Sequence, residues 1–274
     1  VAGNDTFNGS QMAVGGFPNG PFKTIGTAIT AAADGETITI LANTYAEAIS
    51  TAKAITFEVQ TSGGNSVVTI TSITYTGGAT KTVTYTDAAG GGVGTFLLTA
   101  GITLTSGTVN FGTAVVVPTG QTITRTLGAL TGTAPTTTNV NVTYNGALTA
   151  GMTAGNELPA SLGSGKLTLS HTGDLLTIPN AVSVNDVQST TTGNVTFAST
   201  LTTTGGGTTD VNIDGVNTFT VSGTATIAGG IDIDAGYVSM GATSIAAYTL
   251  DNDGGAATFA SVDLNGQNLL NTSG

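Results

Sequence analysis

The chain has 274 residues, only 8% of them charged, and a formal net charge of −11 at pH 7. Five Lys and Arg residues in all cannot provide the basic surface that neutralises phosphates, which argues against nucleic acid and anionic membranes as partners. The densest apolar run, Ala114 to Val117, is far too short for a membrane-spanning helix, so no membrane insertion is expected.

Thr and Gly replace the missing charge, and there is no cysteine. Thr is β-branched and favours strands, while Gly allows the tight turns that need positive φ. This composition predicts many short strands joined by many turns. Because the chain begins at Val1 rather than at Met, and because abundant Thr, Asn and Gly suit exported proteins, we expect an extracellular or cell-surface protein after removal of a signal peptide.

The first predicted elements are a short amphipathic helix and two strands. The helix lies within Pro21 to Ala33, where apolar residues recur at helical spacing, and Asp34-Gly35 ends it. The strands are Thr37 to Leu41 and Ala54 to Val59.

These elements carry a family resemblance. Gly20-Pro21-Phe22-Lys23-Thr24-Ile25, Ala28-Ile29, Ala31 to Ile38, and Asn43-Thr44-Tyr45 with Glu47 resemble the opening of the pectate-lyase-like right-handed parallel β-helix superfamily. The resemblance covers about 50 residues of the chain and departs from the family at Asn43, where the family has Gly. It implies an all-β fold, a right-handed parallel β-helix with a short N-terminal capping helix. It carries no catalytic residue, because the family's active sites lie in the middle coils.

Downstream, short strand patterns alternate with turns, and we expect one β-solenoid domain over residues 1–274. The predicted strands include Val67–Thr71, Phe96–Thr99, Thr108–Phe111, Ala114–Val117, Thr122–Thr126, Val140–Tyr144, Lys166–Ser170, Val195–Phe197, Val211–Ile213, Thr218–Val221 and Ile231–Ile233. Segment 73–86 mirrors itself around Gly77-Gly78, which predicts a protruding hairpin. Segment 128–165 is poorer in strand signals, and we expect it to be irregular, either a long excursion or a boundary between two solenoid segments.

Arg125 and His171 are candidates for catalytic residues. Arg125 lies in the strand Thr122-Ile123-Thr124-Arg125, and we interpret it as a solvated strand residue rather than a lyase arginine. His171 is the sole histidine, and we interpret it as a surface residue at a strand end, since one histidine cannot form a multi-histidine metal site. We therefore predict no catalytic residues, no organic cofactor and no enzymatic activity.

Acidic residues gather in the C-terminal third. Asp232 and Asp234 share one strand face, and Asp251-Asn252-Asp253-Gly254 is rich in oxygen ligands. The pattern gives a calcium hypothesis for Asp232, Asp234, Asp251 and Asp253, with an acidic solvent face as the alternative. Thr-x-Thr pairs, which form the flat face of ice-binding solenoids, also recur along the chain, but at no regular period, so the sequence does not predict that they align.

The chain ends differ in character. The N-terminal end has a predicted capping helix, whereas the C-terminal end, with Val262, Leu264, Leu269 and Leu270 as assembly candidates, shows no helix pattern. An end with unpaired strands is a template for association, and a head-to-tail contact that does not close gives a filament. The expected function is a structural subunit of an extracellular filament or surface layer, a homopolymer. The alternatives are a cell-surface adhesin that binds glycans and a polysaccharide lyase or hydrolase.

Overall fold

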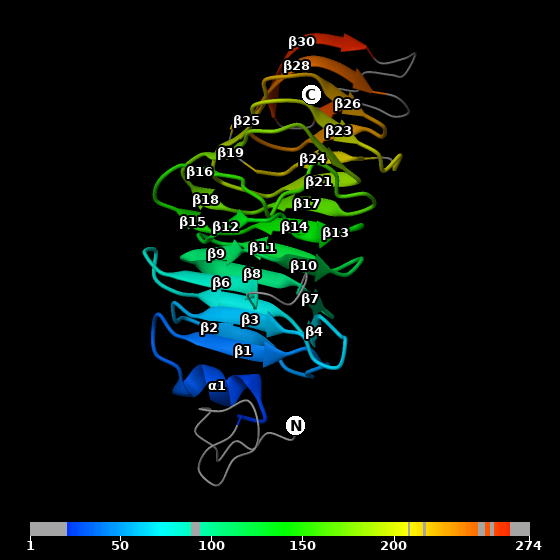
Figure 1. Ribbon diagram of the computed structural model, residues 1–274. Coiled ribbons are helices and arrows are strands. Elements are labelled where there is room, and N and C mark those ends of the chain that lie inside the picture. The colour runs from blue at the N-terminus through cyan, green and yellow to red at the C-terminus, as the bar shows by residue number, and fades with distance from the viewer. Residues whose placement is uncertain are drawn as a thin grey trace. The chain divides into compact units, whose positions relative to one another are not determined.

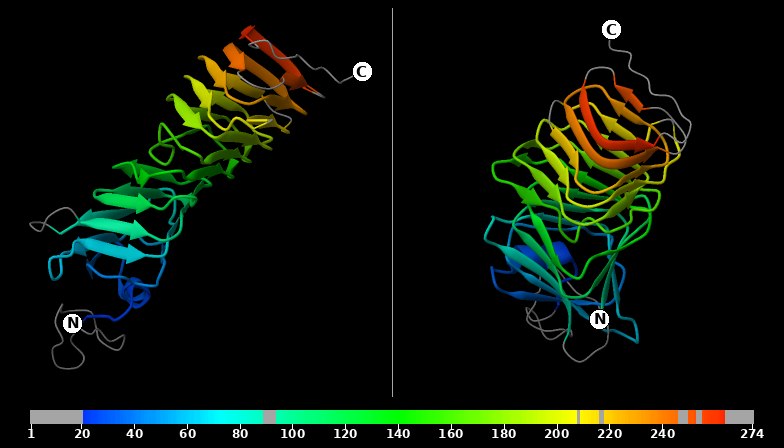
Figure 2. Two further views of the ribbon diagram at one scale, coloured as in Figure 1. Left: turned by 90° about the vertical axis from the view of Figure 1, so that its right-hand side faces the viewer. Right: turned by 90° about the horizontal axis from the view of Figure 1, so that it is seen from above.

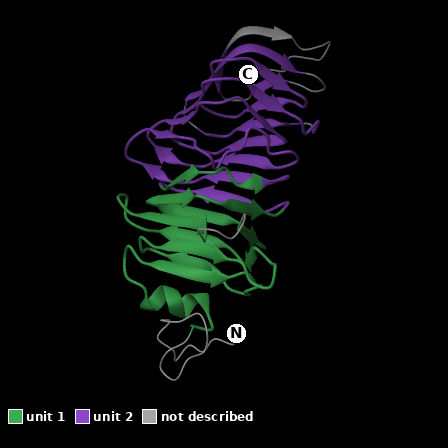
Figure 3. Cartoon of the chain, viewed as in Figure 1, with its two compact units in different colours: residues 1–118, 128–136 green, residues 119–127, 137–274 purple. Residues whose placement is uncertain are grey.

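The computed structural model describes residues 21–88, 94–207, 209–215, 218–245, 250–252 and 255–263, with the backbone alone at 259–263. Their fold is all-β, a parallel β-solenoid of about ten turns with one short helix (Figure 1). Every pairing between named strands that the described residues make is parallel. The predicted fold class is therefore confirmed. By contact density the chain divides into two compact units, 1–118 with 128–136, and 119–127 with 137–274 (Figure 3).

The first unit contains the helix and three parallel sheets. Helix α1 (Ile25–Ala31) is shorter than predicted; it begins after the N-cap Thr24, whose hydroxyl accepts a hydrogen bond from Thr27 N, and it buries Ile25 and Ile29. The sheets contain, in spatial order, β1 (Thr37–Leu41), β3 (Thr56–Gln60), β6 (Thr82–Asp87), β9 (Thr108–Phe111) and β12 (Ala129–Gly132); then β4 (Val67–Ile70), β7 (Thr95–Leu98) and β10 (Ala114–Val117); then β2 (Ile49–Thr51), β5 (Ile73–Thr76) and β8 (Ile102–Ser106). The short strand β13 (Thr136–Thr137) lies at the unit boundary.

The second unit has two long parallel sheets, which Figure 2 shows as stacked strands from green to red. The first contains β11 (Thr122–Arg125), β14 (Asn141–Tyr144), β17 (Lys166–Leu169), β21 (Asp186–Ser189), β24 (Val211–Ile213), β27 (Ile231–Ile233) and β29 (Leu250–Asn252). The second contains β16 (Met152–Thr153), β19 (Leu176–Ile178), β22 (Val195–Phe197), β25 (Thr218–Val221), β28 (Tyr237–Ile245), β26 (Ala225–Ile227), β23 (Leu201–Thr203) and β20 (Val182–Val184), with β30 (Ala256–Asp263) beside β28. Two short strands, β15 (Ala147–Leu148) and β18 (Thr172–Gly173), pair separately.

In each unit, every second side chain of a strand points into the interior. In the first unit the ring of Tyr85 contacts three others, with centroids 5.3 Å from Phe57, 5.2 Å from Phe96 and 5.5 Å from Phe111. In the second unit Phe197 and Phe219 lie 5.3 Å apart on neighbouring strands. Alternation along each strand therefore builds a continuous apolar core and leaves Thr, Asn and Asp on the outside.

The predicted hairpin at 73–86 is wrong. β5 pairs with β2 and β8, and β6 pairs with β3 and β9, all in parallel. Gly77 serves a different purpose. Tyr75 is buried, and its hydroxyl occupies the space that a Cβ atom at Gly77 would need. A corner that folds closely around an inward tyrosine has the same local composition as a hairpin turn, which explains the error.

Segment 128–165 continues the coils. It contains the four-residue strands β12 and β14 and three strands of two residues, β13, β15 and β16, before a loop over 154–165. Leu162 in this loop is fully buried, and Ser161 forms an isolated bridge with Ser183 of β20. The sequence of this segment shows few strand signals because its strands are short and one of its loops packs into the core.

Candidate functional site

The C-terminal edge of the second unit is the first candidate site. β30 pairs with β28 over seven register pairs, from Tyr237 opposite Ala256 to Ser244 opposite Asp263. Among the strands that the structure describes, none pairs with the other edge of β30. Val262 lies in β30 opposite Thr243, whereas Leu264, Leu269 and Leu270 lie outside the described residues. Of the predicted assembly site, the structure therefore describes the backbone of β30.

Hydrogen-bond direction alternates along this strand. Ala256 N donates to Gly236 O at 2.9 Å, so the residue that follows, Ala257, directs its N–H toward the opposite edge. A parallel strand offers such groups at every second residue, and an unpaired row of them is a template for another strand.

The N-terminal end of the first unit is closed by α1. Lys53 Nζ, from the turn after β2, donates to three carbonyl oxygens at the C-terminus of the helix: Ile29 at 2.7 Å, Thr30 at 3.0 Å and Ala32 at 2.6 Å. Near the other end of the helix, Glu47 Oε2 accepts from Gly26 N at 3.0 Å. These are favourable charges for the two helix ends, so the helix is fixed against the coils by electrostatics as well as by apolar packing.

The acidic residues of the calcium hypothesis lie on adjacent strands. Asp232 of β27 pairs in register with Asp251 of β29, and Asp234 follows β27 directly. Partial burial, followed by a hydrogen bond and repulsion from Asp234, raises the pKa of Asp214 above its usual range. Within the described part of the chain, no group of three or more His, Cys, Asp or Glu side chains is arranged to hold a metal ion, and Asp253 lies outside that part. Calcium binding stays a prediction.

Arg125 is not a solvated residue, contrary to the interpretation from sequence. It is 6% exposed, and its Nη1 donates to Glu157 Oε1 at 2.5 Å and to Thr153 O at 2.8 Å. The same carboxylate oxygen accepts from Tyr144 Oη at 2.9 Å and from Gly155 N at 2.8 Å. Burial and the Glu157 carboxylate hold the pKa of Tyr144 well above its usual range. The guanidinium is part of a core network. The sequence did carry a signal for its burial, because strand alternation puts Arg125 on the same face as the apolar Ile123.

His171 is also buried, so its interpretation as a surface residue is wrong. Its Nε2 lies 3.2 Å from Asn194 O, and no hydrogen-bond partner reaches Nδ1. A Cβ atom at Gly193 would lie 2.7 Å from the imidazole ring, so the neighbouring coil needs glycine to admit the ring. Burial lowers the pKa of His171, which favours the neutral imidazole.

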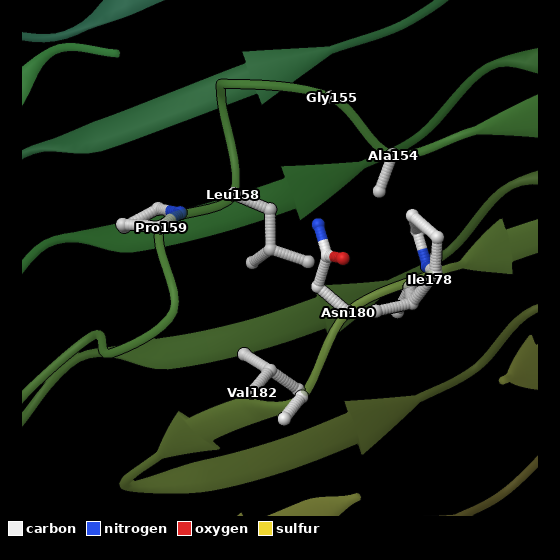
Figure 4. Close-up of a pocket in the computed structure, with 9 residues that line it drawn as sticks. Ala154, Gly155, Leu158, Pro159, Ile178, Asn180 and Val182 are labelled. Atoms are coloured by element: carbon white, nitrogen blue, oxygen red, sulfur yellow. The ribbon is translucent and has the colours of Figure 1, made fainter. Parts of the chain in front are cut away.

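A shallow hollow lies between the 154–159 loop and the turn at 178–182 (Figure 4). Figure 4 shows Leu158, Ile178 and Val182 around it, with the amide of Asn180 at its centre. The space suffices for about one water molecule, so we assign it no ligand.

In comparisons with known proteins, no family model, no curated protein and no solved structure matches this chain. The sole helix among the described residues, α1, is seven residues long, and no helix there has the length and apolarity needed to cross a membrane.

Proposed function

We propose that the protein is a non-enzymatic structural subunit of an extracellular filament or surface layer, a homopolymer that assembles head to tail through the ends of its solenoid. One observation carries the proposal: β30 is hydrogen-bonded along one edge to β28, and no described strand covers its other edge. Strand addition to that edge satisfies the backbone groups that Ala257 and its alternate neighbours direct outward.

The N-terminal end supports the same proposal, because it is covered by a helix whereas the outer edge of β30 is paired with no described strand. There, α1 packs against β1 and β2, and a lysine and a glutamate fix its two ends. Because the C-terminal edge of the second unit and the α1 end of the first unit differ, a contact between the two in neighbouring copies is heterologous, and such a contact forms an open series when the rotation between copies does not close.

We further infer that the solenoid is right-handed and related to the pectate-lyase-like superfamily. The support is the capping segment: α1 and β1 lie where the resemblance implies a helix followed by the first coil. Arg125, on which the lyase alternative relied, is engaged in the core by Glu157. We also propose export after removal of a signal peptide.

Electron microscopy and sedimentation of the purified chain test the assembly. The wild-type protein should form fibres or sheets of uniform width. Ala257→Pro removes an N–H that points away from β28, so it should abolish assembly while the fold is kept; Ala257→Ser retains the N–H and is the matched control. Monodisperse wild-type particles, a closed dimer, or equal assembly by both variants would contradict the proposal.

A further inference from the structure

The outward face of the sheet formed by β16, β19, β22, β25, β28 and β30 has an unusual composition. One register column on this face contains a hydroxyl side chain at every strand: Thr153, Thr177, Thr196, Thr220, Ser239 and Thr258. The intervals between these residues differ along the chain, so the alignment is visible in the register and not in the sequence. Adjacent strands lie about 4.8 Å apart, which sets the spacing of the hydroxyls.

The neighbouring column carries apolar, amide and hydroxyl groups. Thr218, Tyr237 and Ala256 pair in succession, and Leu175 and Asn194 precede the paired residues Leu176 and Val195. Tyr237 is 43% exposed and Leu175 is 37% exposed, which makes them two of the three exposed large hydrophobic side chains among the described residues. Tyr237 Oη forms a hydrogen bond with Thr258 Oγ1 at 3.1 Å, which links the two columns. An exposed aromatic ring anchored by its hydroxyl is a pre-oriented contact surface.

The two columns carry no Asp, Glu, Lys or Arg, in a protein of net charge −11. Asp263 of β30 pairs with Ser244 and lies outside these columns. The other long sheet of the same unit is the internal comparison. Its outward column begins with Thr124, Thr143 and Thr168, and it then changes to Gln188, Asn212, Asp232 and Asp251. Strand propensity does not explain the difference, because both columns have the same place in the same fold.

We propose that this face, defined by Leu175, Asn194, Thr196, Thr220 and Tyr237 with their column neighbours, binds a neutral polysaccharide chain. The absence of charge selects a neutral partner over uronates, nucleic acids and basic proteins. The rows of hydroxyls offer donors and acceptors that match the hydroxyls of sugars at a repeated interval. The C–H faces of sugar rings pack against Tyr237 and Leu175, which supply the apolar contact that hydroxyls alone lack. This activity is adhesion and goes beyond the assembly function.

Sedimentation with insoluble cellulose and chitin tests the proposal, with polygalacturonate gel as the charged comparison. The wild-type protein should bind at least one of the neutral polymers and not polygalacturonate. Tyr237→Ala should weaken binding about tenfold, the effect of losing one central anchor. Thr220→Glu, which places a charge in the hydroxyl column, should weaken it at least as much. Thr143→Glu, at an outward position on the other sheet, is the matched control and should bind as wild type.

Circular dichroism and melting temperature confirm that each variant is folded before it is compared, and Thr220→Asn offers an uncharged replacement if Thr220→Glu does not fold. The proposal is overturned if the folded wild-type protein binds neither neutral polymer. It is equally overturned if Tyr237→Ala and Thr220→Glu bind as Thr143→Glu does, or if polygalacturonate is preferred. Binding is the protein that sediments beyond the amount in a control without polysaccharide, so fibres do not count as binding and the outcome is separate from that of the assembly experiment.

Discussion

Among the described residues, the buried charged side chains lie in the second unit, where Arg125 and Glu157 meet inside the core. Taking two ions out of water costs several kcal/mol, and the cost is offset when every nearby donor and acceptor is paired. Here one oxygen of Glu157 accepts from Arg125, Tyr144 and Gly155, while Oε2 has no partner. The network is therefore sensitive to the loss of any one charge.

We expect Arg125→Met to lower the free energy of unfolding by about 3–5 kcal/mol, because it leaves an unpaired carboxylate in the core. Arg125→Met with Glu157→Gln should recover a large part of the loss, since the amide oxygen still accepts from Tyr144 and Gly155 without a buried charge. Urea unfolding of the two single variants and the double variant measures this coupling. Additive effects would show that the two residues do not interact.

His171 predicts an acid-sensitive stability. Its pKa is lowered in the folded protein, so below the usual value of about 6.5 the unfolded chain binds more protons than the folded one. The stabilisation is complete above that value and is lost as pH falls through the folded pKa. The melting temperature should therefore fall between about pH 7 and pH 5 in wild type and change less in His171→Gln, which remains neutral. If both proteins respond equally to pH, other groups are responsible.

At the scale of elements, α1 depends on a few side chains outside it. A helix of seven residues is unstable by itself, and its last carbonyl groups need partners. Lys53 supplies three hydrogen bonds to these carbonyls from the turn after β2. The carbonyl groups at the C-terminal end of α1 therefore depend on one ammonium group.

Lys53→Met should destabilise the helix by about 1–3 kcal/mol, the usual contribution of hydrogen bonds to a charged group. Amide hydrogen exchange should accelerate in residues 25–32 before it does so in β3 or β6. Lys81→Met is the comparison, because the ion pair of Lys81 with Asp34 is exposed and should matter less. Equal exchange rates in the two variants would contradict the role of Lys53.

Strand positions were largely predictable from sequence, but several contacts were not. Thr108–Phe111, Ala114–Val117 and Val211–Ile213 are strands at the predicted bounds, because alternation and Gly-rich corners define them locally. The continuous strand β28 was missed, since Gly241 and small residues interrupt its pattern. Burial of His171 depends on Gly193 in another coil, a contact that no local pattern carries. The hydroxyl column was missed because register, not spacing, aligns its members.

On the scale of the whole molecule, the fold is a series of coils in which strands of successive coils pair in parallel. Stability in such a series is a sum of nearest-neighbour contributions, so the terminal coils open first. This arrangement suits a durable polymer subunit, because strand addition at an end converts the least stable coil into an interior one. Assembly and stability are then linked, and the assembled chain should melt at a higher temperature than dispersed protein.

The pairing of Arg125 with Glu157 has a further consequence for a chain built from similar Thr-rich strands. Many such strands can exchange places with little loss, because each presents the same alternation of apolar and hydroxyl side chains. β11 is different. A shift of one residue would turn the guanidinium of Arg125 to solvent and leave the carboxylate of Glu157 unpaired in the interior. The buried ion pair therefore fixes the register of β11, and with it the register of the strands that pair with β11.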